Sequence, residues 1–420
     1  MTGMKTILAT LAVALMSTSA MAGEVRVLWY SDGVEGEVMA DLLKRFEKDN
    51  PDIKVTLDNV AYNVIKEQLP VQLEAGSGPD IARVTDLKAL AGHWLDLRPL
   101  VKDAAYWEEN FGAQFDWMRP DGTDIIPGFM TQLTLTGGFA NKTLFEQAGV
   151  AIPDKKATWE DWAKASKAVM DSQQTPMAMA MDRSGHRFTG PAISMGAKLI
   201  GADGMPAVID DGFKTMASMF VDWNNSGLMS KEVWVSASGT TYRAAVDDFI
   251  NGQLPYYYSG SWQIPNLSTK IGDAFDWVAT GSPCGPGGCA ALPGGAGLVA
   301  IKYTKNPQDV AKVMDYLGST EVVKEFTERT LFLPAHKGVA AGQIDFKTDD
   351  ANAKAALESY VADSTNINPI AAKTPAWKWQ SIVFGAIVTR IGQAVAGEMS
   401  LDDAYARIDE DIKQKVAEAK

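Results

Sequence analysis

The spacing of apolar positions alternates between a strand-like and a helical pattern over the first part of the chain. Residues 24–30 (EVRVLWY) are a mostly apolar run that is typical of a buried strand. In residues 38–46 the apolar side chains recur at helical spacing and fall on one face. The same order follows with a strand over residues 53–57, a helix over 62–73 and a strand over 80–84. This β-α-β-α-β order with tight loops predicts an α/β fold with a parallel sheet covered by helices on both faces.

The predicted sheet also indicates where a ligand would bind. In open parallel sheets, ligands bind at the carboxyl ends of the strands. The loops at these ends follow Tyr30, Leu57 and Val84.

A different pattern follows and predicts a second domain. Residues 128–139 are extended and long enough to cross between two domains. Residues 158–161 (TWED) have the composition of a capping box, with Thr158 as the N-cap and Asp161 reaching back, and predict a helix start. Further helices are predicted over residues 191–200, 212–223, 307–317, 321–330, 377–396 and 401–419, and further strands over residues 254–258 and 297–302.

The N-terminal segment predicts export from the cytoplasm. Lys5 precedes a short apolar run over residues 7–16, and Ala20-Met21-Ala22 has the small-x-small pattern of a signal peptidase site. The run is too short to span a bilayer, which needs about 20 apolar residues. We therefore predict a signal peptide over residues 1–22, cleavage near Ala22 and a periplasmic mature protein. The site holds no cysteine for lipid attachment.

The chain length predicts the number of domains, and the net charge indicates which kinds of partner are disfavoured. The 398 residues left after removal of 22 from 420 exceed one ordinary core, so two domains are expected. The chain has 39 basic and 52 acidic residues, and loss of Lys5 leaves a formal charge of 38 − 52 = −14. An acidic surface disfavours binding to nucleic acid and to anionic membranes.

The two cysteines, Cys284 and Cys289, lie close together in the sequence SPCGPGGCAALPGG. In an oxidising compartment such a pair is expected to form a disulfide. The loop is short, so we interpret the bond as one that fixes a local hairpin. A redox-active pair and a two-cysteine metal site are the weaker interpretations.

The sequence lacks a Gly-x-Ser-x-Gly elbow, a His-Glu-x-x-His motif and a Walker loop. The three histidines, His93, His186 and His336, are far apart in sequence, and we interpret them as core or surface residues. Residues 295–300 (GAGLVA) match the dinucleotide fingerprint by letter, but they precede a strand instead of joining a strand to a helix. We therefore predict no catalytic residue, no metal site and no cofactor.

Tryptophan gives the positive signal for a binding site. The chain has 12 tryptophans, and Trp29, Trp234 and Trp262 lie in turns or glycine-rich segments rather than on helical faces. Flat aromatic rings suit stacking against the C–H surface of a sugar ring, while neighbouring polar side chains bind its hydroxyl groups. Core packing is the alternative for each of them.

Several short stretches occur in an order that resembles the family 1 extracellular solute-binding proteins of ABC transporters, the group that contains maltose-binding protein. They are residues 24–50, GSGPDI at 76–81, ANKTLFEQAG at 140–149, TWEDW at 158–162, FINGQ at 249–253, GSW at 260–262, PGG at 293–295 and LPAH at 333–336. The resemblance implies two α/β lobes, each a mainly parallel sheet flanked by helices, joined by a hinge with multiple crossings. It places lobe 1 at residues 23–133 and 290–340, and lobe 2 at residues 134–289 and 341–420. It also implies a monomer that delivers its ligand to an inner-membrane ABC permease.

The resemblance also implies a set of ligand-binding residues in the cleft between the lobes. Asp32 and Glu35 would accept hydrogen bonds from hydroxyl groups, Trp262 would stack on the ligand, and the glycines would let backbone amides approach it. Arg83 interrupts an apolar strand and therefore needs a paired carboxylate or a ligand. The set comprises Trp29, Asp32, Glu35, Arg83, Thr85, Asp86, Arg183, Arg187, Trp262, Gly294, Gly295, Asn366, Trp377 and Trp379.

The expected function is the capture of a sugar, oligosaccharide or sugar-like polyol for an ABC importer, with no bond made or broken. One alternative is a binding protein for a polyamine, a phosphonate or an amino-acid derivative. The other is a secreted carbohydrate-active enzyme, for which carboxylate pairs such as Asp32 with Glu35 would supply the acid and the nucleophile.

Overall fold

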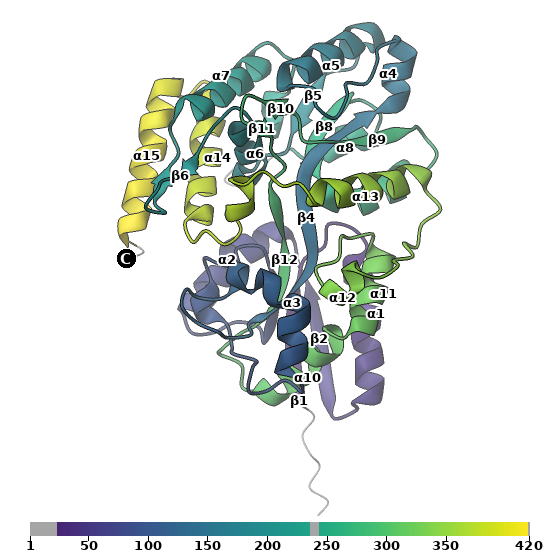
Figure 1. Cartoon of the computed structure of the whole chain (residues 1–420), viewed down its shortest axis with the longest axis vertical. Helices are drawn as coiled ribbons and strands as arrows, with labels where there is room; N and C mark the ends of the chain where they lie inside the picture. The colour runs from purple at the N-terminus through teal and green to yellow at the C-terminus, as the bar shows by residue number, and fades with distance from the viewer. Residues whose placement is uncertain (1–22, 236–242, 419–420) are drawn as a thin grey trace, which may run out of the picture.

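The computed structural model describes residues 23–235 and 243–418. The predicted signal peptide, residues 1–22, lies outside this range. The described chain forms two lobes, one above the other in Figure 1, with two long strands running between them. Over residues 23–235 and 243–418 we find no helix with the combined length and apolarity that a bilayer crossing requires.

The two lobes share one eight-stranded sheet of strand order β2-β1-β3-β12-β4-β8-β5, with β9 paired to β4. Strands β1, β2 and β3 are parallel, as are β5 and β8. Strand β12 runs antiparallel to β3 and β4, and β4 runs antiparallel to β8 and β9. The strands are β1 (Gly23–Trp29), β2 (Ile53–Asn59), β3 (Ile81–Val84), β4 (Gly128–Asn141), β5 (Met179–Met181), β8 (Tyr256–Gly260), β9 (Trp277–Gly281) and β12 (Pro293–Ala300).

Strand β4 confirms the prediction that residues 128–139 cross between domains. Its first half pairs with β12 and its second half with β8 and β9 (Figure 1). Near its middle, the Leu133 N–H donates to the Leu333 carbonyl over 2.9 Å. Leu133 packs against the hydrophobic cores of both lobes.

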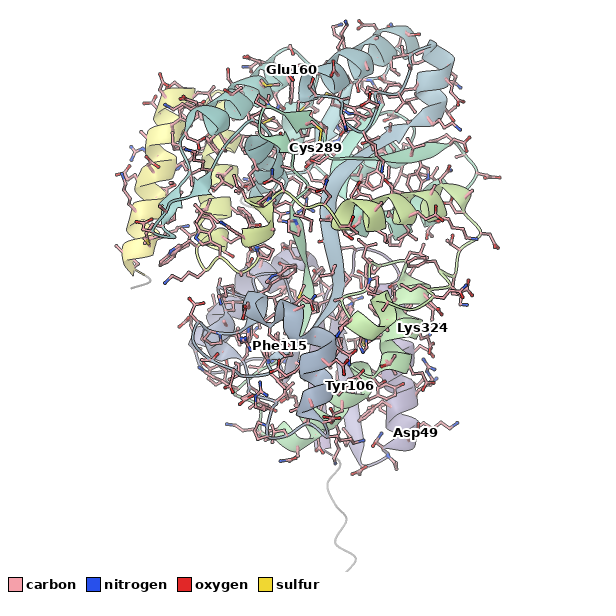
Figure 2. All side chains as sticks on the ribbon, in the orientation of Figure 1. Asp49, Tyr106, Phe115, Glu160, Cys289 and Lys324 are labelled. Carbon is pink, nitrogen blue, oxygen red and sulfur yellow. A yellow bond between two sulfur atoms is a disulfide. The ribbon has the colours of Figure 1, made fainter. Side chains whose placement is uncertain are left out.

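Each lobe has its own core. The core of lobe 1 contains Leu42, Phe111 and Met314, whereas the core of lobe 2 contains Phe139 and Ile387. Figure 2 places Phe115 and Tyr106 in lobe 1 and Cys289 in lobe 2. The mixed α/β, two-lobed fold class is thus confirmed; the residue boundaries of the lobes stay a prediction.

Helices cover the sheet in both lobes. Lobe 1 has α1 (Glu35–Asp49), α2 (Tyr62–Glu74), α3 (Ala104–Met118), α10 (Pro307–Leu317), α11 (Thr320–Thr330) and α12 (Lys337–Ala340). Lobe 2 has α4 (Lys142–Ala148), α5 (Trp159–Gln173), α6 (Gly185–Ser194), α7 (Asp211–Asn225), α8 (Ala245–Ile250), α9 (Ile264–Ile271), α13 (Ala351–Ser364), α14 (Gln380–Ala396) and α15 (Leu401–Glu418).

Local signals account for several helix ends. Thr158 and Asp161 form the predicted capping box at the start of α5. The helix predicted over residues 191–200 is wrong in its bounds: α6 begins at Gly185, because Ser184 accepts a hydrogen bond from the His186 N–H, and it ends before Gly196 at φ 102°.

Candidate functional site

Charged and aromatic side chains from both lobes meet beside the crossing strands. Lobe 1 contributes the loop after β1 and the end of β3, both at the carboxyl end of the parallel strands. Lobe 2 contributes the end of β5, the first turn of α6 and the short 3-10 turn Ser261–Gln263 after β8. An added Cβ on Gly33 of lobe 1 would lie 3.7 Å from Pro265 of lobe 2, so the two lobes contact each other here. We call Asp32, Glu35, Arg83, Asp182, His186, Arg187 and Trp262 the inter-lobe group.

Arg83 is the buried residue around which the lobe 1 members of the inter-lobe group are arranged. It is fully enclosed, and its Nη1 donates to Glu35 Oε1 over 3.0 Å and to the Tyr30 carbonyl. Burial disfavours the charge, yet Tyr30, Glu35 and Asp32 together hold the pKa of Arg83 above its usual value. Of the two partners that the sequence allowed for Arg83, a carboxylate or a ligand, the structure shows the carboxylate of Glu35.

The rings around Arg83 complete this environment. Its guanidinium carbon lies 4.2 Å from the ring centroid of Tyr30 and 4.8 Å from that of Trp29, which are cation–π distances. Trp29 is fully buried in the core of lobe 1 and packs edge-on against Phe326. Trp29 therefore packs against the Arg83 guanidinium within the core of lobe 1.

Both carboxylate oxygens of Glu35 accept hydrogen bonds from groups of lobe 1. Its Oε1 accepts from the Asp32 N–H as well as from Arg83, and its Oε2 accepts from the Gly33 N–H over 2.8 Å. These bonds fold the loop after β1 over the start of α1. The Asp32 side chain, in the same loop, is 32% exposed.

Asp32 faces charges from both lobes. Burial, together with Glu35 and Asp182, raises the pKa of Asp32 to about 6, against the opposing effect of Arg83 and Arg187. Its Oδ2 lies 3.9 Å from Arg83 Nη2. The carboxyl group can thus change its protonation state close to neutral pH.

Asp182 follows β5 and is a buried acid of lobe 2. Its Oδ2 accepts from Tyr257 Oη over 2.8 Å and from Ser259 Oγ over 2.7 Å. Burial raises the pKa of Tyr257 well above its usual value, and the Asp182 charge acts in the same direction. The two hydroxyl donors hold Asp182 at the inter-lobe surface.

His186 and Arg187 occupy the first turn of α6, beside Trp262. The Arg187 guanidinium carbon lies 4.3 Å from the Trp262 ring centroid, and the His186 and Trp262 rings are 6.4 Å apart in an edge-on arrangement. Arg187 Nε is buried without a hydrogen-bond acceptor among the described residues. Burial and the Arg187 charge lower the pKa of His186 to about 3, and the Lys66 charge of lobe 1 acts in the same direction. The imidazole is therefore neutral.

A direct hydrogen bond joins the lobes near this group. Ser381 Oγ of α14 donates to Asp86 Oδ1 over 3.1 Å, and Lys66 donates to Asp86 Oδ2. Beside them, Tyr62 Oη and Thr85 Oγ1 are 2.9 Å apart. Thr85 and Asp86 thus lie at the inter-lobe surface, where the predicted sheet places them.

The remaining predicted residues have other surroundings. Arg183 Nε donates to the Trp234 carbonyl over 3.0 Å. An added Cβ on Gly294 would lie 3.2 Å from His186 Nε2, next to the inter-lobe group, whereas one on Gly295 would strike the Gln132 carbonyl of the neighbouring strand at 2.2 Å. Close strand packing therefore explains Gly295.

The three residues predicted near the last lobe crossing are Asn366, Trp377 and Trp379. Asn366 is exposed just beyond α13, and its N–H donates to the Asp363 carbonyl over 3.1 Å. Trp377 is buried and donates from Nε1 to the Gly204 carbonyl over 2.8 Å. Trp379 is buried with Lys378 Nζ 4.6 Å above its ring. These contacts are all within lobe 2.

Sequence reasoning missed Tyr62, Lys66, Asp182, His186 and Ser381 as members of the inter-lobe surface. Asp182 had a usable signal, because it directly follows the apolar strand β5 at a carboxyl end. His186 had no such signal, because nothing local indicates that its helix turn faces the other lobe; the sequence supports only a core or surface residue.

Comparison with known proteins agrees with this architecture. The family described as bacterial extracellular solute-binding protein matches residues 30–324. A binding protein of Brucella abortus is 25% identical over 375 residues, 82% of this chain and 84% of the relative. The maltodextrin-binding protein MdxE of Bacillus subtilis is 24% identical over 400 residues, 90% and 88% of the two chains. The GacH receptor of Streptomyces glaucescens superposes with a TM-score of 0.77 at 19% identity, covering 94% of this chain and 98% of that structure.

Proposed function

This chain belongs to the bacterial extracellular solute-binding protein family, and on that premise we propose that it captures a sugar, oligosaccharide or sugar-like polyol between its lobes for an ABC importer. The relatives support the carbohydrate class. MdxE is named for maltodextrin, and GacH was solved in complex with acarbose.

One observation carries the proposal: an aromatic ring and polar groups of both lobes converge at one place. The Arg187 guanidinium of lobe 2 lies over the Trp262 ring, and the charges of Arg187 and Asp182, both of lobe 2, act on Asp32 of lobe 1. An indole face and hydrogen-bonding groups at its edge are what binding of a polyhydroxylated ring requires. Asp32 and Asp86 would accept from ligand hydroxyls, and Arg187 would donate to ligand oxygens. Arg83 is enclosed in lobe 1 and would act indirectly, through the Asp32 loop.

Reversible capture would use the two lobes as a clamp. A ligand that contacts both lobes favours the closed arrangement, because only differential contacts can shift such an equilibrium. The bond between Ser381 and Asp86 joins the lobes directly and would lower the cost of closure. The role is binding, and no covalent step is needed.

Location and assembly complete the proposal. The protein is exported, its signal peptide is cleaved near Ala22, and the mature chain diffuses as a monomer in the periplasm between the outer membrane and the permease. Residues 23–133 with 290–340 form lobe 1, and residues 134–289 with 341–420 form lobe 2. The Cys284–Cys289 bond is kept by the oxidising compartment.

A thermal-shift panel of monosaccharides, oligosaccharides, polyols and their acidic or aminated derivatives tests the proposal. A ligand that binds only the native state raises Tm. We expect at least one carbohydrate to raise Tm, with saturation confirmed by calorimetry. If no carbohydrate raises Tm but a polyamine, a phosphonate or an amino-acid derivative does, the proposed ligand class is wrong and that compound class takes its place. Turnover of a glycoside that Asp32→Ala abolishes would instead indicate an enzyme.

A further inference from the structure

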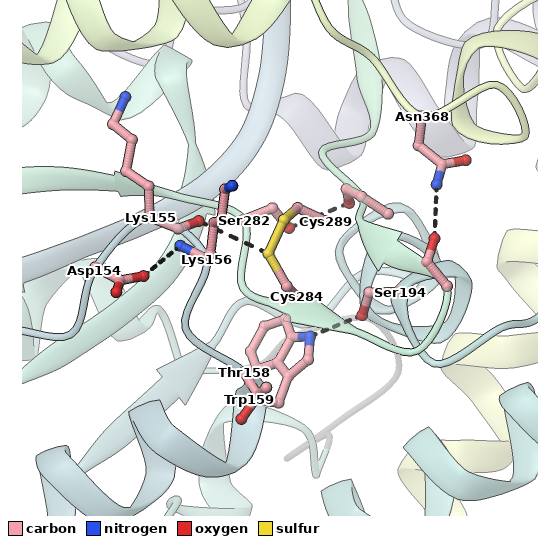
Figure 3. Close-up of a disulfide and its surroundings, with 12 residues drawn as sticks. Asp154, Lys155, Lys156, Thr158, Trp159, Ser194, Ser282, Cys284, Cys289 and Asn368 are labelled. Atoms are coloured by element: carbon pink, nitrogen blue, oxygen red, sulfur yellow. Dashed lines mark hydrogen bonds between the residues drawn. A yellow bond between two sulfur atoms is a disulfide. The ribbon is translucent and has the colours of Figure 1, made fainter.

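The Cys284–Cys289 hairpin lies against the far end of the helix that carries His186 and Arg187. The two short strands β10 (Cys284–Gly285) and β11 (Gly288–Cys289) pair antiparallel, and the sulfurs are bonded. Figure 3 shows the disulfide between the loop at Lys155 and the Ser194 end of α6. We call residues 284–293, which run from this hairpin into β12, the strap.

The hairpin end of the strap caps the C-terminus of α6. The Gly287 N–H donates to the Ser194 carbonyl over 2.7 Å and so satisfies one of the last carbonyls of the helix. A Cβ on Gly287 would lie 2.3 Å from the Ile193 carbonyl, and one on Gly285 would lie 2.6 Å from the Ser194 carbonyl. Only glycine allows the strap backbone to approach the helix this closely.

The strap then follows α6 to its other end. The Ala290 carbonyl would be 2.6 Å from a Cβ placed on Gly190, in the middle of the helix. At the first turn, the Pro293 carbonyl lies 3.4 Å from His186 Nε2. Because Pro293 is the first residue of β12, the strap joins this turn directly to a strand that crosses between the lobes.

The strap is also fixed on its other sides. The Leu292 N–H donates to Thr136 Oγ1 of β4 over 2.8 Å, and Asn368 Nδ2 donates to the Gly287 carbonyl over 3.2 Å. The Cys284 N–H donates to the Ala157 carbonyl over 2.9 Å. The tip of the hairpin, Gly285-Pro286-Gly287-Gly288, has three glycines and would have many conformations without the cross-link.

We propose that the Cys284–Cys289 disulfide positions the first turn of α6, and with it His186 and Arg187, at the inter-lobe surface. The cross-link holds the hairpin against Ser194, the strap holds Pro293 against His186, and the helix between them cannot shift along its axis. The importance of this position for a ligand rests on the proposed function. The positioning itself can be tested without a ligand.

The test uses the three histidines as internal reporters in the mature ligand-free protein. Imidazole proton–carbon NMR spectra are compared between the native chain and the double variant Cys284→Ser with Cys289→Ser. We expect the His186 signal to shift while those of His93 and His336, both in lobe 1, stay in place. An unchanged His186 signal in the folded double variant would overturn the proposal and reduce the disulfide to a local stabiliser.

Two further variants separate positioning from loss of stability. Gly287→Ala keeps both cysteines but forces the hairpin away from Ile193, and we expect it to shift the His186 signal too. If the double variant does not fold, this variant decides, and an unchanged signal overturns the proposal. Asp350→Ala removes the N-cap of α13 in the same lobe, and we expect it to lower Tm without moving His186. Failure of the sugar panel would overturn the proposed function but leave this test intact.

Discussion

The Arg83 guanidinium donates to Glu35 Oε1 over 3.0 Å, and neither side chain has any exposed surface. Strand β3 supplies the arginine and the first turn of α1 supplies the carboxylate, 48 residues away. A buried charge without a partner is costly, so each of the two groups requires the other. Glu35 also accepts hydrogen bonds from the Asp32 and Gly33 N–H groups, so the pair supports the loop that carries Asp32.

Replacement of Glu35 should therefore destabilise lobe 1 strongly. We expect Glu35→Ala to lower the free energy of unfolding by about 3–5 kcal/mol, because Arg83 is left charged and unpaired. Urea denaturation measures the loss. The exposed pair of Arg26 with Asp58 is the matched control, and Asp58→Ala should cost about 0–1 kcal/mol. Similar losses for the two variants would contradict the assignment.

Asp32 should make stability depend on pH in a defined direction. The folded pKa of about 6 lies above the value of about 3.9 of an unfolded aspartate, so the folded state holds more protons between these pH values. The contribution of Asp32 to stability is therefore fully present below this window and is lost as the pH rises through about 6. Asp32→Asn removes the titration and leaves the other groups in place.

The measurement is the difference in unfolding free energy between the native chain and Asp32→Asn at about pH 4 and about pH 7. We expect acidification to stabilise the native chain relative to the variant. A difference that does not change with pH would show that the pKa of Asp32 is not raised.

The bond between Ser381 and Asp86 should favour contact between the lobes. We expect Ser381→Ala to increase the radius of gyration of the ligand-free protein in small-angle X-ray scattering, at a cost of about 0.5–1.5 kcal/mol in stability. Ser359→Ala is the control, because it removes a bond to Lys155 within lobe 2. An unchanged radius for both variants would mean that other contacts hold the lobes together.

Trp262 should supply the ring face in the proposed ligand site. We expect Trp262→Ala to weaken binding of the best carbohydrate of the panel about tenfold, equivalent to about 1.4 kcal/mol. Isothermal titration calorimetry gives Kd directly. Trp223→Phe, at a ring that packs on Trp159 within lobe 2, should leave Kd unchanged. Equal affinities for the native chain and Trp262→Ala would exclude stacking on this ring.

The sequence predicted the first lobe well because its signals are local. Strands β1 and β3 carry apolar runs, and the helix between β1 and β2 has one apolar face, so each element could be recognised from its own residues. The long strand β4 was predicted to cross between domains for the same reason. The need of Arg83 for a carboxylate or a ligand followed from its place in an apolar strand.

Pairings between distant segments could not be derived in this way. Periodicity does not indicate that β12 lies antiparallel between β3 and β4, because strand partners are chosen by burial of the whole sheet. It also does not indicate that the turn with His186 faces Asp32 and Lys66 of the other lobe.

The sequence by itself thus determined the α/β class, the two-lobed organisation and the family, since these depend on local periodicity and on short motifs in a fixed order. Only the tertiary structure decided which predicted site residues meet. It enclosed Trp29 and Glu35 inside lobe 1 and brought Arg187 onto Trp262. The physical reason is that burial and pairing of charges depend on every element that packs around a side chain, and these elements come from both lobes.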